Sequence, residues 1–437
     1  MRQDLPATEM GHRHAFGPCV SPTASAQWWA VGCWLTSTLI VLAAITFGPA
    51  CLARDAQIAS PARGGPADRM CNWDGHWYQT IAVNGYNYSR SEHSSIVFFP
   101  LYPLTARALF STGVSAEIAL LLVSNACFLG ALLLFERYLC AAGAHLSTRR
   151  WALLALAFAP CSFFFHVAYT ESMLLFLTIA ALYGMRRRWS LASIAFCIGA
   201  ATATRSVGVA LLVPFAIHLN ARFHEETADC DAQPLHMSPG RRGVSFSNFT
   251  VAASWLVLAC WGLLAFIAFQ AWHFGDPLAF AHAQFAWGVR DPAPTIRAHI
   301  VQLVSLEPVW STYIRHTAGY WGSGAINADP LLNLSFANPL FFLGTVVLIA
   351  AGAALRFLDI KEVTLGTFLL LIPYIAQTSR QCMTSQGRFA AVVFPGYIVL
   401  GHLFGRLPRP LALYFLLSSG ALMMLYATLF GAGYEFL

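Results

Sequence analysis

Asp74, Glu171, Arg205 and Arg388 are the residues whose types and settings point most directly to chemistry, because each interrupts or borders a long apolar stretch. Asp74 stands among aromatic neighbours in the stretch Trp73-Asp-Gly-His-Trp-Tyr78. Partial burial makes a carboxylate a better proton acceptor. Asp74 is therefore a candidate general base that takes a proton from a hydroxyl group.

Each of these residues also has a purely structural interpretation. Trp73, Trp77 and Tyr78 have the amphipathic rings that gather at a membrane–water boundary, so this stretch could be an aromatic belt with an incidental acid. Glu171 and Arg205 could form an ion pair that holds two helical segments together. Asp74 and His76 alone are too few ligands to define a metal site, so no metal is predicted.

The composition decides which elements must position these side chains. Of the 437 residues, 57% are apolar and only 11% are charged, and the mean hydropathy is +0.58. Ordinary soluble domains carry about 25% charged residues, so this chain cannot cover a water-exposed surface. A soluble enzyme and a disordered, fibrous or nucleic-acid-binding chain are thereby excluded. We predict an all-α polytopic membrane protein with a single domain over residues 1–437.

Apolar runs of about 20 residues predict membrane-spanning helices. Two longer runs, 151–185 and 190–219, are interrupted near Glu171 and at Arg205, which predicts two helical hairpins. A re-entrant pair or one long tilted helix stays open for 190–219. The expected spans number about eleven: 28–53, 116–139, 151–167, 171–185, 190–204, 206–219, 250–272, 338–355, 362–379, 389–405 and 410–431.

Basic residues in short loops set the predicted orientation, because Lys and Arg concentrate on the cytoplasmic side. The Arg186–Arg188 triplet is the strongest indication, and it places the tail 1–27 and the loop 220–249 inside. The long loops 54–115 and 273–337 then lie outside.

The first outer loop is expected to carry short interfacial helices at 75–84 and 104–111. Cys71 and Cys382 also fall outside, where a disulfide between them is an open alternative. The four ionisable residues named first all fall on this same outer face, although they come from distant parts of the chain. Their convergence indicates a site.

Several motifs occur in order between residues 70 and 400. They are Trp73–Tyr78 (WDGHWY) with Gly85-Tyr86, Phe98–Pro103 (FFPLYP), Phe163–Ser172 (FFFHVAYTES), Ala203–Ser206 (ATRS), Gly275–Leu278 (GDPL) with Gln284 and Trp287, and Ser385–Phe389 (SQGRF) with Phe394-Pro395. Together these motifs resemble the PIG-V type mannosyltransferases, members of the GT-C superfamily of multi-spanning glycosyltransferases. The last motif has Phe389 where the family is expected to have Tyr.

The resemblance implies a GT-C-like helical bundle, a sugar donor carried on a polyprenyl phosphate, and a lipid-linked or glycan acceptor. It implies an inverting glycosyltransferase, with mannose as the expected sugar and Asp74 as the catalytic base. Arg388, and after it Arg205, would bind the phosphate, because a guanidinium group matches phosphate geometry with paired hydrogen bonds. No cofactor is expected beyond the lipid-linked sugar, which is a co-substrate, and a divalent metal is not expected.

Further substrate-binding candidates stand in the same motifs. Glu171 would orient sugar hydroxyls or hold Arg205, and Trp77 and Tyr78 would stack on sugar rings. His76 would bind the acceptor or assist proton transfer, with an interfacial histidine as the alternative. Asp276, Gln284 and Trp287 are weaker candidates for the acceptor side.

Arginine outnumbers lysine 25 to one, which points to a GC-rich and hence bacterial genome. The expected location is then the bacterial cytoplasmic membrane with the site facing the periplasm, or the endoplasmic reticulum membrane if the chain is eukaryotic. Two other functions stay open. A transporter or lipid flippase is disfavoured because no internal repeat and no polar path across the membrane is evident. A non-catalytic assembly partner would leave Asp74 dispensable.

Overall fold

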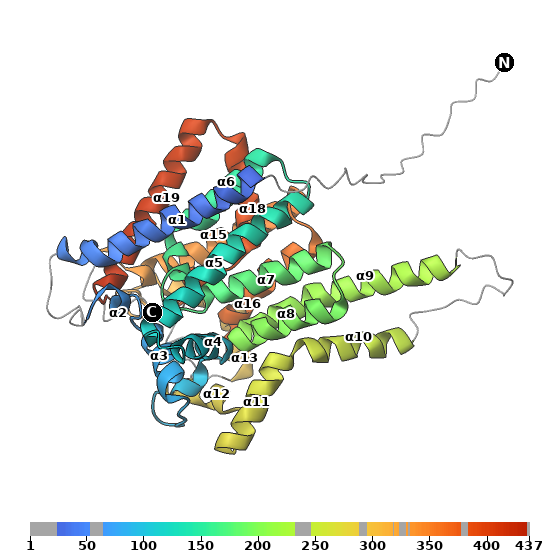
Figure 1. Ribbon diagram of the computed structural model, residues 1–437, viewed down its shortest axis with the longest axis horizontal. Coiled ribbons are helices and arrows are strands. Elements are labelled where there is room, and N and C mark those ends of the chain that lie inside the picture. Colours follow the sequence, from blue (N-terminus) through green and yellow to red (C-terminus); the bar gives the residue numbers. More distant parts are fainter. Residues whose placement is uncertain are drawn as a thin grey trace.

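The computed structural model describes residues 24–52, 64–231, 246–287, 295–317, 319–322, 329–330, 333–376 and 383–434, and within them every regular element is a helix. This confirms the predicted all-α class. Most of the long helices run side by side in Figure 1. They are α1 (Ala24–Phe47), α5 (Ala116–Ala141), α6 (Leu146–Phe158), α7 (Glu171–Arg186), α8 (Leu191–Thr204), α9 (Leu212–Asp231), α10 (Phe246–Ala259), α11 (Trp261–Phe274), α15 (Leu334–Ala354), α16 (Ile360–Ala376), α18 (Phe394–Arg406) and α19 (Arg409–Gly431).

Short helices occupy both predicted outer loops. The two helices expected in the first loop are present as α3 (Asp74–Asn84) and α4 (Leu101–Phe110). The remaining short elements are η1 (Gly48–Ala50), α2 (Pro66–Arg69), η2 (Ser95–Val97), η3 (Pro160–Phe165), η4 (Ser206–Leu211), α12 (Ala279–His282), η5 (Ala283–Phe285), α13 (Ile296–Val304), α14 (Glu307–Ser311) and α17 (Gln386–Ala391).

Local sequence signals explain where several helices begin. The side-chain oxygen of Ser115 accepts a hydrogen bond from the Ile118 N–H at the start of α5, and Ser190 does the same for Ser193 at the start of α8. Such caps satisfy amides that have no partner inside the helix. Pro395 lies in the first turn of α18, where a missing N–H costs no hydrogen bond.

Five of the described helices are long and apolar enough to cross a membrane: Ser25–Ala50, Ala116–Ala141, Ser206–Glu225, Leu334–Ala354 and Arg409–Gly431. The pair α10 and α11 makes a sixth if its two parts, bent by 60°, form one span. The count of eleven spans stays a prediction, because α6, α7, α8, α16 and α18 each have fewer than 18 residues.

The chain reverses at Arg205, as the predicted second hairpin requires. A Cβ added to Gly208 would lie 2.5 Å from the carbonyl carbon of Ala201 on the opposite arm. Farther along the same hairpin, Arg188 Nη2 lies 3.0 Å from Glu225 Oε2. One long tilted helix over 190–219 is therefore excluded. Helix α9 continues to Asp231, so the beginning of the expected 220–249 loop is helical.

The predicted span 250–272 is not one straight helix, because it breaks at Cys260 between α10 and α11. Trp261 packs on Gly199, where no side chain would fit, and its Nε1 donates to the Phe196 carbonyl (3.3 Å). The hydroxyl oxygen of Thr202 accepts from the Leu263 N–H (3.2 Å). The contact with Thr202 of α8 thus satisfies the Leu263 N–H, which the break leaves without a partner inside the helix.

Charged residues mark two opposite ends of the bundle. Helix α7 begins at Glu171 and ends at Arg186, and its 16 residues rise about 24 Å at 1.5 Å per residue. The first hairpin begins and ends beside the last turns of α5, at the Arg186 end. Near the start of α6, Arg149 pairs with Glu136 of α5, and at the end of α7, Arg186 donates to the hydroxyl of Tyr138 of α5 (3.2 Å). We refer to these as the Asp74 end and the Arg186 end.

Candidate active site

Asp74 is the first residue of α3, and the chain enters this helix through a strained residue. Trp73 has φ +57°, a value that non-glycine residues rarely adopt and that often accompanies functional sites. The turn is anchored at Asn72, whose side-chain amide donates to the Phe430 carbonyl (2.9 Å). The Ala168 N–H donates to the Met70 carbonyl (3.0 Å), so the start of α3 is docked on the turn between α6 and α7.

Arg388 reaches the same place from α17. This helix begins after Ser385, which has φ +60°, and the Gly387 N–H donates to Asn338 Oδ1 of α15 (2.9 Å). A Cβ on Gly387 would lie 2.8 Å from the Phe341 ring and 2.9 Å from the sulfur of Cys161. Only glycine permits this close approach, which brings Arg388 against the α6–α7 turn.

The four ionisable residues meet in one series of ion pairs at the Asp74 end. Arg388 Nη1 lies 2.5 Å from Asp74 Oδ2, and Arg388 Nε lies 3.0 Å from Glu171 Oε1. Arg205 Nη1 pairs with the same Glu171 oxygen. We call Asp74, Arg388, Glu171 and Arg205 the ion-pair chain. It joins α3, α17, α7 and the turn between α8 and η4.

Access differs along the ion-pair chain. The side chain of Asp74 is 15% exposed and that of Arg205 is 18% exposed, whereas Glu171 is 1% exposed. Asp74 and Arg205 therefore keep some exposed surface. Glu171 lies behind them and acts by holding both guanidinium groups, and breaking a buried pair of this kind costs about 3–5 kcal/mol.

Aromatic rings flank the two guanidinium groups. The ring of Phe389 lies 4.9 Å from Arg205 Cζ and 5.6 Å from Arg388 Cζ, and that of Tyr169 lies 5.2 Å from Arg388 Cζ. Cation–π attraction at such distances orients a guanidinium group and contributes about 0.5–2 kcal/mol. These contacts use the ring of Phe389 and need no hydroxyl, which explains why Phe can stand where Tyr was expected.

The arrangement places two carboxylates beside two guanidinium groups. Asp74 and Glu171 carry two negative charges, and Arg388 and Arg205 carry two positive ones, so the formal charge of the ion-pair chain is zero. Both arginines remain positively charged at any physiological pH. A phosphate that approaches this site would compete with the carboxylates for the two guanidinium groups.

Tyr78 and Thr170 connect the ion-pair chain to the first loop. The Tyr78 hydroxyl donates to Thr170 Oγ1 (3.4 Å), and Arg205 Nη1 lies 3.5 Å from the same oxygen. Burial raises the pKa of Tyr78, so its hydroxyl keeps its proton. Tyr78 is buried in this structure, and it would have to move to stack on a sugar ring.

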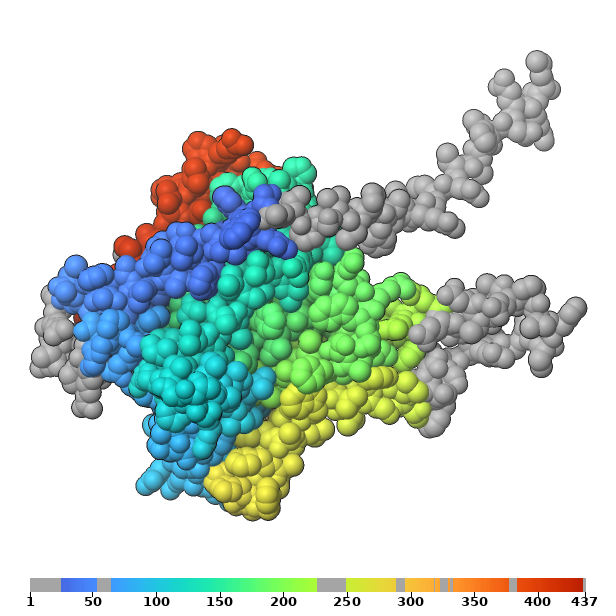
Figure 2. All heavy atoms as spheres, in the orientation of Figure 1, coloured from blue at the N-terminus to red at the C-terminus, as the bar shows by residue number. Residues whose placement is uncertain are grey.

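Trp77 and Trp287 lie together, as residues from the two predicted outer loops. Their ring centroids are 5.2 Å apart, and Phe98 lies 5.6 Å from Trp287. The imidazole of His93 stacks on Trp287 at 4.4 Å. The blue and teal spheres of the first loop border the yellow spheres of α11 in Figure 2, on the face shown. An aromatic cluster thus joins the loops beside α3.

Asp276 has its own partners, away from the ion-pair chain. Its Oδ2 accepts hydrogen bonds from the Tyr88 hydroxyl (2.6 Å) and from Arg90 Nη2 (2.9 Å), and it lies 2.8 Å from His282 Nδ1. Hydrogen bonds, first of all the one from Tyr88, hold the pKa of Asp276 below its usual range. Asp276 therefore joins the two outer loops.

His76 and Gln284 have no contact with the ion-pair chain among the interactions of the described residues. His76 is exposed on α3, with Nδ1 3.5 Å from Gln79 Oε1. Gln284 is half-buried on η5. No three His, Cys, Asp or Glu side chains cluster as metal ligands in the described ranges. Cys382 lies outside these ranges, and Cys71 is a buried free thiol.

Some residues of the site were not singled out from the sequence. Tyr169 and Thr170 belong to a quoted motif and directly precede Glu171, so their position was a usable signal. Asn338 lies in an apolar helix far from every motif, and only the folded chain shows that it anchors α17.

Residues 34–324 match the protein family described as mannosyltransferase (PIG-V). The matched region contains Asp74, Glu171 and Arg205, whereas Arg388 lies beyond it. No curated protein matches the chain.

Solved structures of an archaeal oligosaccharyltransferase from Archaeoglobus fulgidus show a distant similarity. The enzyme AglB in complex with an inhibitory peptide and a dolichol-phosphate is 14% identical, with a TM-score of 0.41 over 94% of this chain and 56% of that chain. The apo form is 13% identical, with a TM-score of 0.43 and the same coverage. The form tethered to an acceptor peptide with the NVT sequon is 12% identical, with a TM-score of 0.39 over 93% and 55% of the two chains. The present chain thus spans little more than half the length of these proteins.

Proposed function

Because the chain belongs to the PIG-V mannosyltransferase family, we propose that it transfers a mannosyl residue from a polyprenyl phosphate to a hydroxyl group of a lipid-linked or glycan acceptor. The family is one of glycosyltransferases, and several helices are long and apolar enough to cross a membrane, which supports an integral membrane glycosyltransferase. The transfer inverts the anomeric carbon. It takes place at the Asp74 end of the helices, on the outer or lumenal face.

The observation that best supports this proposal is the contact between Asp74 and Arg388 at a partly open position. A carboxylate and a guanidinium group 2.5 Å apart supply the two groups that the reaction needs, a base for the acceptor and a cation for the leaving phosphate. The two residues are 314 positions apart in the chain, and separate anchors at Asn72 and Asn338 bring them together.

In the proposed reaction each of these groups has one role. The acceptor oxygen attacks the anomeric carbon while Asp74 takes its proton. The bond between that carbon and the phosphate oxygen breaks, and polyprenyl phosphate leaves with the electron pair. Arg388, with Arg205 second, stabilises the negative charge that develops on the phosphate. No metal is assigned to the step.

Donor binding would also free the Asp74 carboxylate from its ion pair with Arg388. In the free protein one oxygen of the Asp74 carboxylate is occupied by its contact with Arg388. A donor phosphate that binds Arg388 would replace Asp74 as its partner. Asp74 would then be free to accept a proton from the acceptor hydroxyl, so the order donor first, acceptor second follows.

The other candidate substrate-binding residues would have supporting roles in the proposed reaction. Glu171 holds the two arginines, and Trp77 and Trp287 form an aromatic surface for sugar rings next to α3. The acceptor side would involve His76, Asp276 and Gln284. The membrane would be the bacterial cytoplasmic membrane, with the site facing the periplasm.

Replacing Asp74 by Asn tests the proposal, because Asn keeps the size of the side chain and cannot take the proton. We expect the rate of mannosyl transfer from a polyprenyl phosphate donor to fall by about 10²–10⁴. Polyprenyl phosphate itself should bind as tightly as to the wild type, or more tightly, because the competing carboxylate is gone.

Asp68→Asn, the same change in nearby α2, is the control and should leave transfer unchanged. Transfer by Asp74→Asn near the wild-type rate would show that Asp74 is not the base. Movement of the donor across vesicles without a new glycosidic bond would favour a flippase instead.

A further inference from the structure

The turn between α6 and α7 contacts the parts of the chain that carry Asp74 and Arg388. Its Ala168 N–H donates to the Met70 carbonyl (3.0 Å), in the segment that leads into Asp74. The ring of Tyr169, which is 3% exposed, lies 5.2 Å from Arg388 Cζ. The position of this turn therefore affects how Asp74 and Arg388 meet.

Helix α5 holds this turn through two adjacent polar residues. Ser124 Oγ donates to the Tyr169 carbonyl (3.2 Å). The side-chain nitrogen of Asn125 donates to the carbonyls of Leu121 (3.0 Å) and His166 (3.1 Å). Asn125 Oδ1 lies 3.1 Å from His166 Nδ1. Asn125 thus contacts both the backbone and the side chain of one residue of the turn.

These contacts define which nitrogen of the His166 ring carries the hydrogen. Both hydrogens of the Asn125 side-chain nitrogen face carbonyl groups, so Oδ1 accepts and His166 Nδ1 donates to it. Thr38 is consistent with this, because its hydroxyl donates to the Trp34 carbonyl (2.7 Å) and can accept from the same Nδ1 (3.3 Å). A neutral imidazole with its hydrogen on Nδ1 fits all of these contacts.

His166 therefore acts on its polar neighbours through Nδ1 alone. The residue is 0% exposed, and its Nε2 has no hydrogen-bond partner among the described residues. The ring of Phe128, also in α5, packs against the imidazole at 89° with ring centroids 5.0 Å apart. Buried hydrogen bonds are costly to break, because the partner that stays behind is left unpaired. Asn125 and His166 thus fix the turn against α5.

We propose that Asn125 and His166 are positioning residues, which hold the α6–α7 turn so that Asp74 and Arg388 meet correctly. Neither side chain contacts the ion-pair chain among the interactions of the described residues. A displacement of about 1 Å at a reacting group can lower a rate by about 10². The effect on mannosyl transfer rests on the proposed function, whereas the hold on the turn does not.

Three variants separate the Nδ1 contact from other properties of these residues. Asn125→Ala removes every contact of the amide. His166→Asn places an amide nitrogen at about the position of Nδ1, so it can still donate to Asn125. His166→Gln places its amide at about the position of Nε2, where no partner is present among the described residues.

Steady-state kinetics of mannosyl transfer, per folded protein, give the first measurement. Asn125→Ala and His166→Gln should lower kcat by about tenfold to a hundredfold, because Asp74 and Arg388 are displaced. The KM for the acceptor should stay unchanged. His166→Asn should keep most of the wild-type kcat. If Asn125→Ala does not fold, the pair His166→Asn and His166→Gln makes the same comparison.

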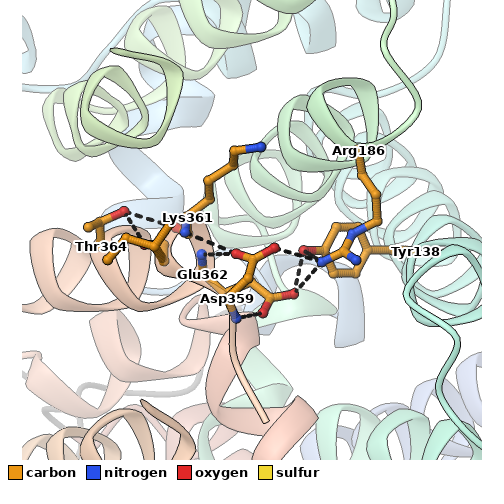
Figure 3. Close-up of polar contacts among 7 residues, drawn as sticks. Tyr138, Arg186, Asp359, Lys361, Glu362 and Thr364 are labelled. Carbon is orange, nitrogen blue, oxygen red and sulfur yellow. Dashed lines mark hydrogen bonds and ion pairs between the residues drawn. The ribbon is translucent and has the colours of Figure 1, made fainter. Parts of the chain in front are cut away.

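Tyr138→Phe is the matched control, because it removes buried hydrogen bonds at the opposite end of the same helix (Figure 3). The Tyr138 hydroxyl donates to Glu362 Oε1 (2.5 Å) and accepts from Arg186 Nη2 (3.2 Å). Tyr138→Phe should lower the unfolding temperature, as Asn125→Ala does, and leave kcat unchanged. A loss of kcat in Asn125→Ala alone would then not be a consequence of lower stability.

Hydrogen–deuterium exchange measures the hold on the turn without a substrate. Exchange in residues 163–172 and 70–76 should rise in Asn125→Ala and His166→Gln. In His166→Asn and Tyr138→Phe it should match the wild type in these residues. If the wild type transferred no mannose, the proposed function would fail, and exchange alone would decide whether Asn125 and His166 hold the turn.

Two results would overturn the proposal. The first is wild-type exchange, or a wild-type kcat in an active enzyme, in both Asn125→Ala and His166→Gln. The second is an equal loss of kcat in His166→Asn and His166→Gln, because the hydrogen bond from Nδ1 would then have no role.

Discussion

Arg388 contacts two carboxylates at once, and its planar side chain makes this possible. Nη1 faces Asp74 while Nε faces Glu171, so the two nitrogen atoms of one rigid group set the distance between two acids. A lysine carries the same charge on a single nitrogen atom and lacks this fixed geometry. The charge of Arg388 and its shape therefore have separate consequences.

Arg388→Lys tests the role of the shape. We expect the transfer rate to fall by about 10²–10³, the loss typical for removing one preorganised stabilising group, because Lys cannot keep its contact with Glu171 while it binds a phosphate. Steady-state kinetics should show a larger effect on the use of the donor than on the use of the acceptor. Arg107→Lys, at an exposed position of α4, is the matched control. A defect confined to the acceptor would contradict the assignment.

At the scale of elements, Asp276 fastens one outer loop to the other. Tyr88 and Arg90 come from the segment after α3, whereas Asp276 precedes α12 and His282 is its last residue. Because the same loops carry Trp77 and Trp287, this contact also maintains the aromatic surface beside α3. Loosening it should affect the acceptor side without touching the ion-pair chain.

Asp276→Asn should loosen both loops, because the charged acceptor of three contacts is lost. Hydrogen–deuterium exchange should rise in residues 85–97 and 276–287 and stay unchanged in α5 and α7. Glu92→Gln, an exposed acid in the same loop, should leave exchange unchanged. Equal exchange in Asp276→Asn and the wild type would show that the loops are held by the aromatic contacts alone.

The same contact has a defined dependence on pH. Since the pKa of Asp276 is lowered in the folded protein, its carboxylate stabilises the fold fully above the ordinary aspartate value of about 3.9. This contribution is lost only as the pH falls below that value. The difference in exchange between the wild type and Asp276→Asn should therefore be constant between pH 5 and 8 and shrink below about pH 4, and a loss of the difference near neutral pH would contradict this.

The elements were more predictable than their contacts. Apolar runs interrupted at Glu171 and Arg205 predicted both hairpins, because a charge inside such a run is tolerated mainly at a turn or a cavity. The break at Cys260 and the helical start of the 220–249 segment were missed, since each depends on partners elsewhere, Thr202 in one case and Arg188 in the other. The pairing of Asp74 with Arg388 links residues 314 positions apart, and no local pattern encodes it.

For the whole molecule, the two charged ends should lie on opposite sides of the membrane. The ion-pair chain forms one end, and Arg186 with Asp359 and Glu362 forms the other. Charged groups at both ends of an apolar bundle fix its depth and prevent it from sliding through the bilayer. The predicted orientation places the Arg186 end in the cytoplasm.

Labelling single cysteines tests this arrangement in intact cells. Arg187→Cys and Asn84→Cys, both at exposed positions, are introduced into a background without native cysteines that retains mannosyl transfer. A membrane-impermeant maleimide should label Asn84→Cys in intact cells and Arg187→Cys only after the membrane is opened. Labelling of both from the same side would refute the arrangement.

The length of α19 has a consequence for its angle to the membrane. Its 23 residues rise about 34 Å, whereas the hydrocarbon core of an ordinary bilayer is about 30 Å thick. Its exposed apolar side chains, among them Leu413, Phe415 and Leu417, offer a surface to the lipid. A helix longer than the hydrocarbon core fits when it tilts away from the bilayer normal. We therefore expect α19 to cross the membrane at a slant, and this slant should change when the protein moves into a thinner or thicker bilayer.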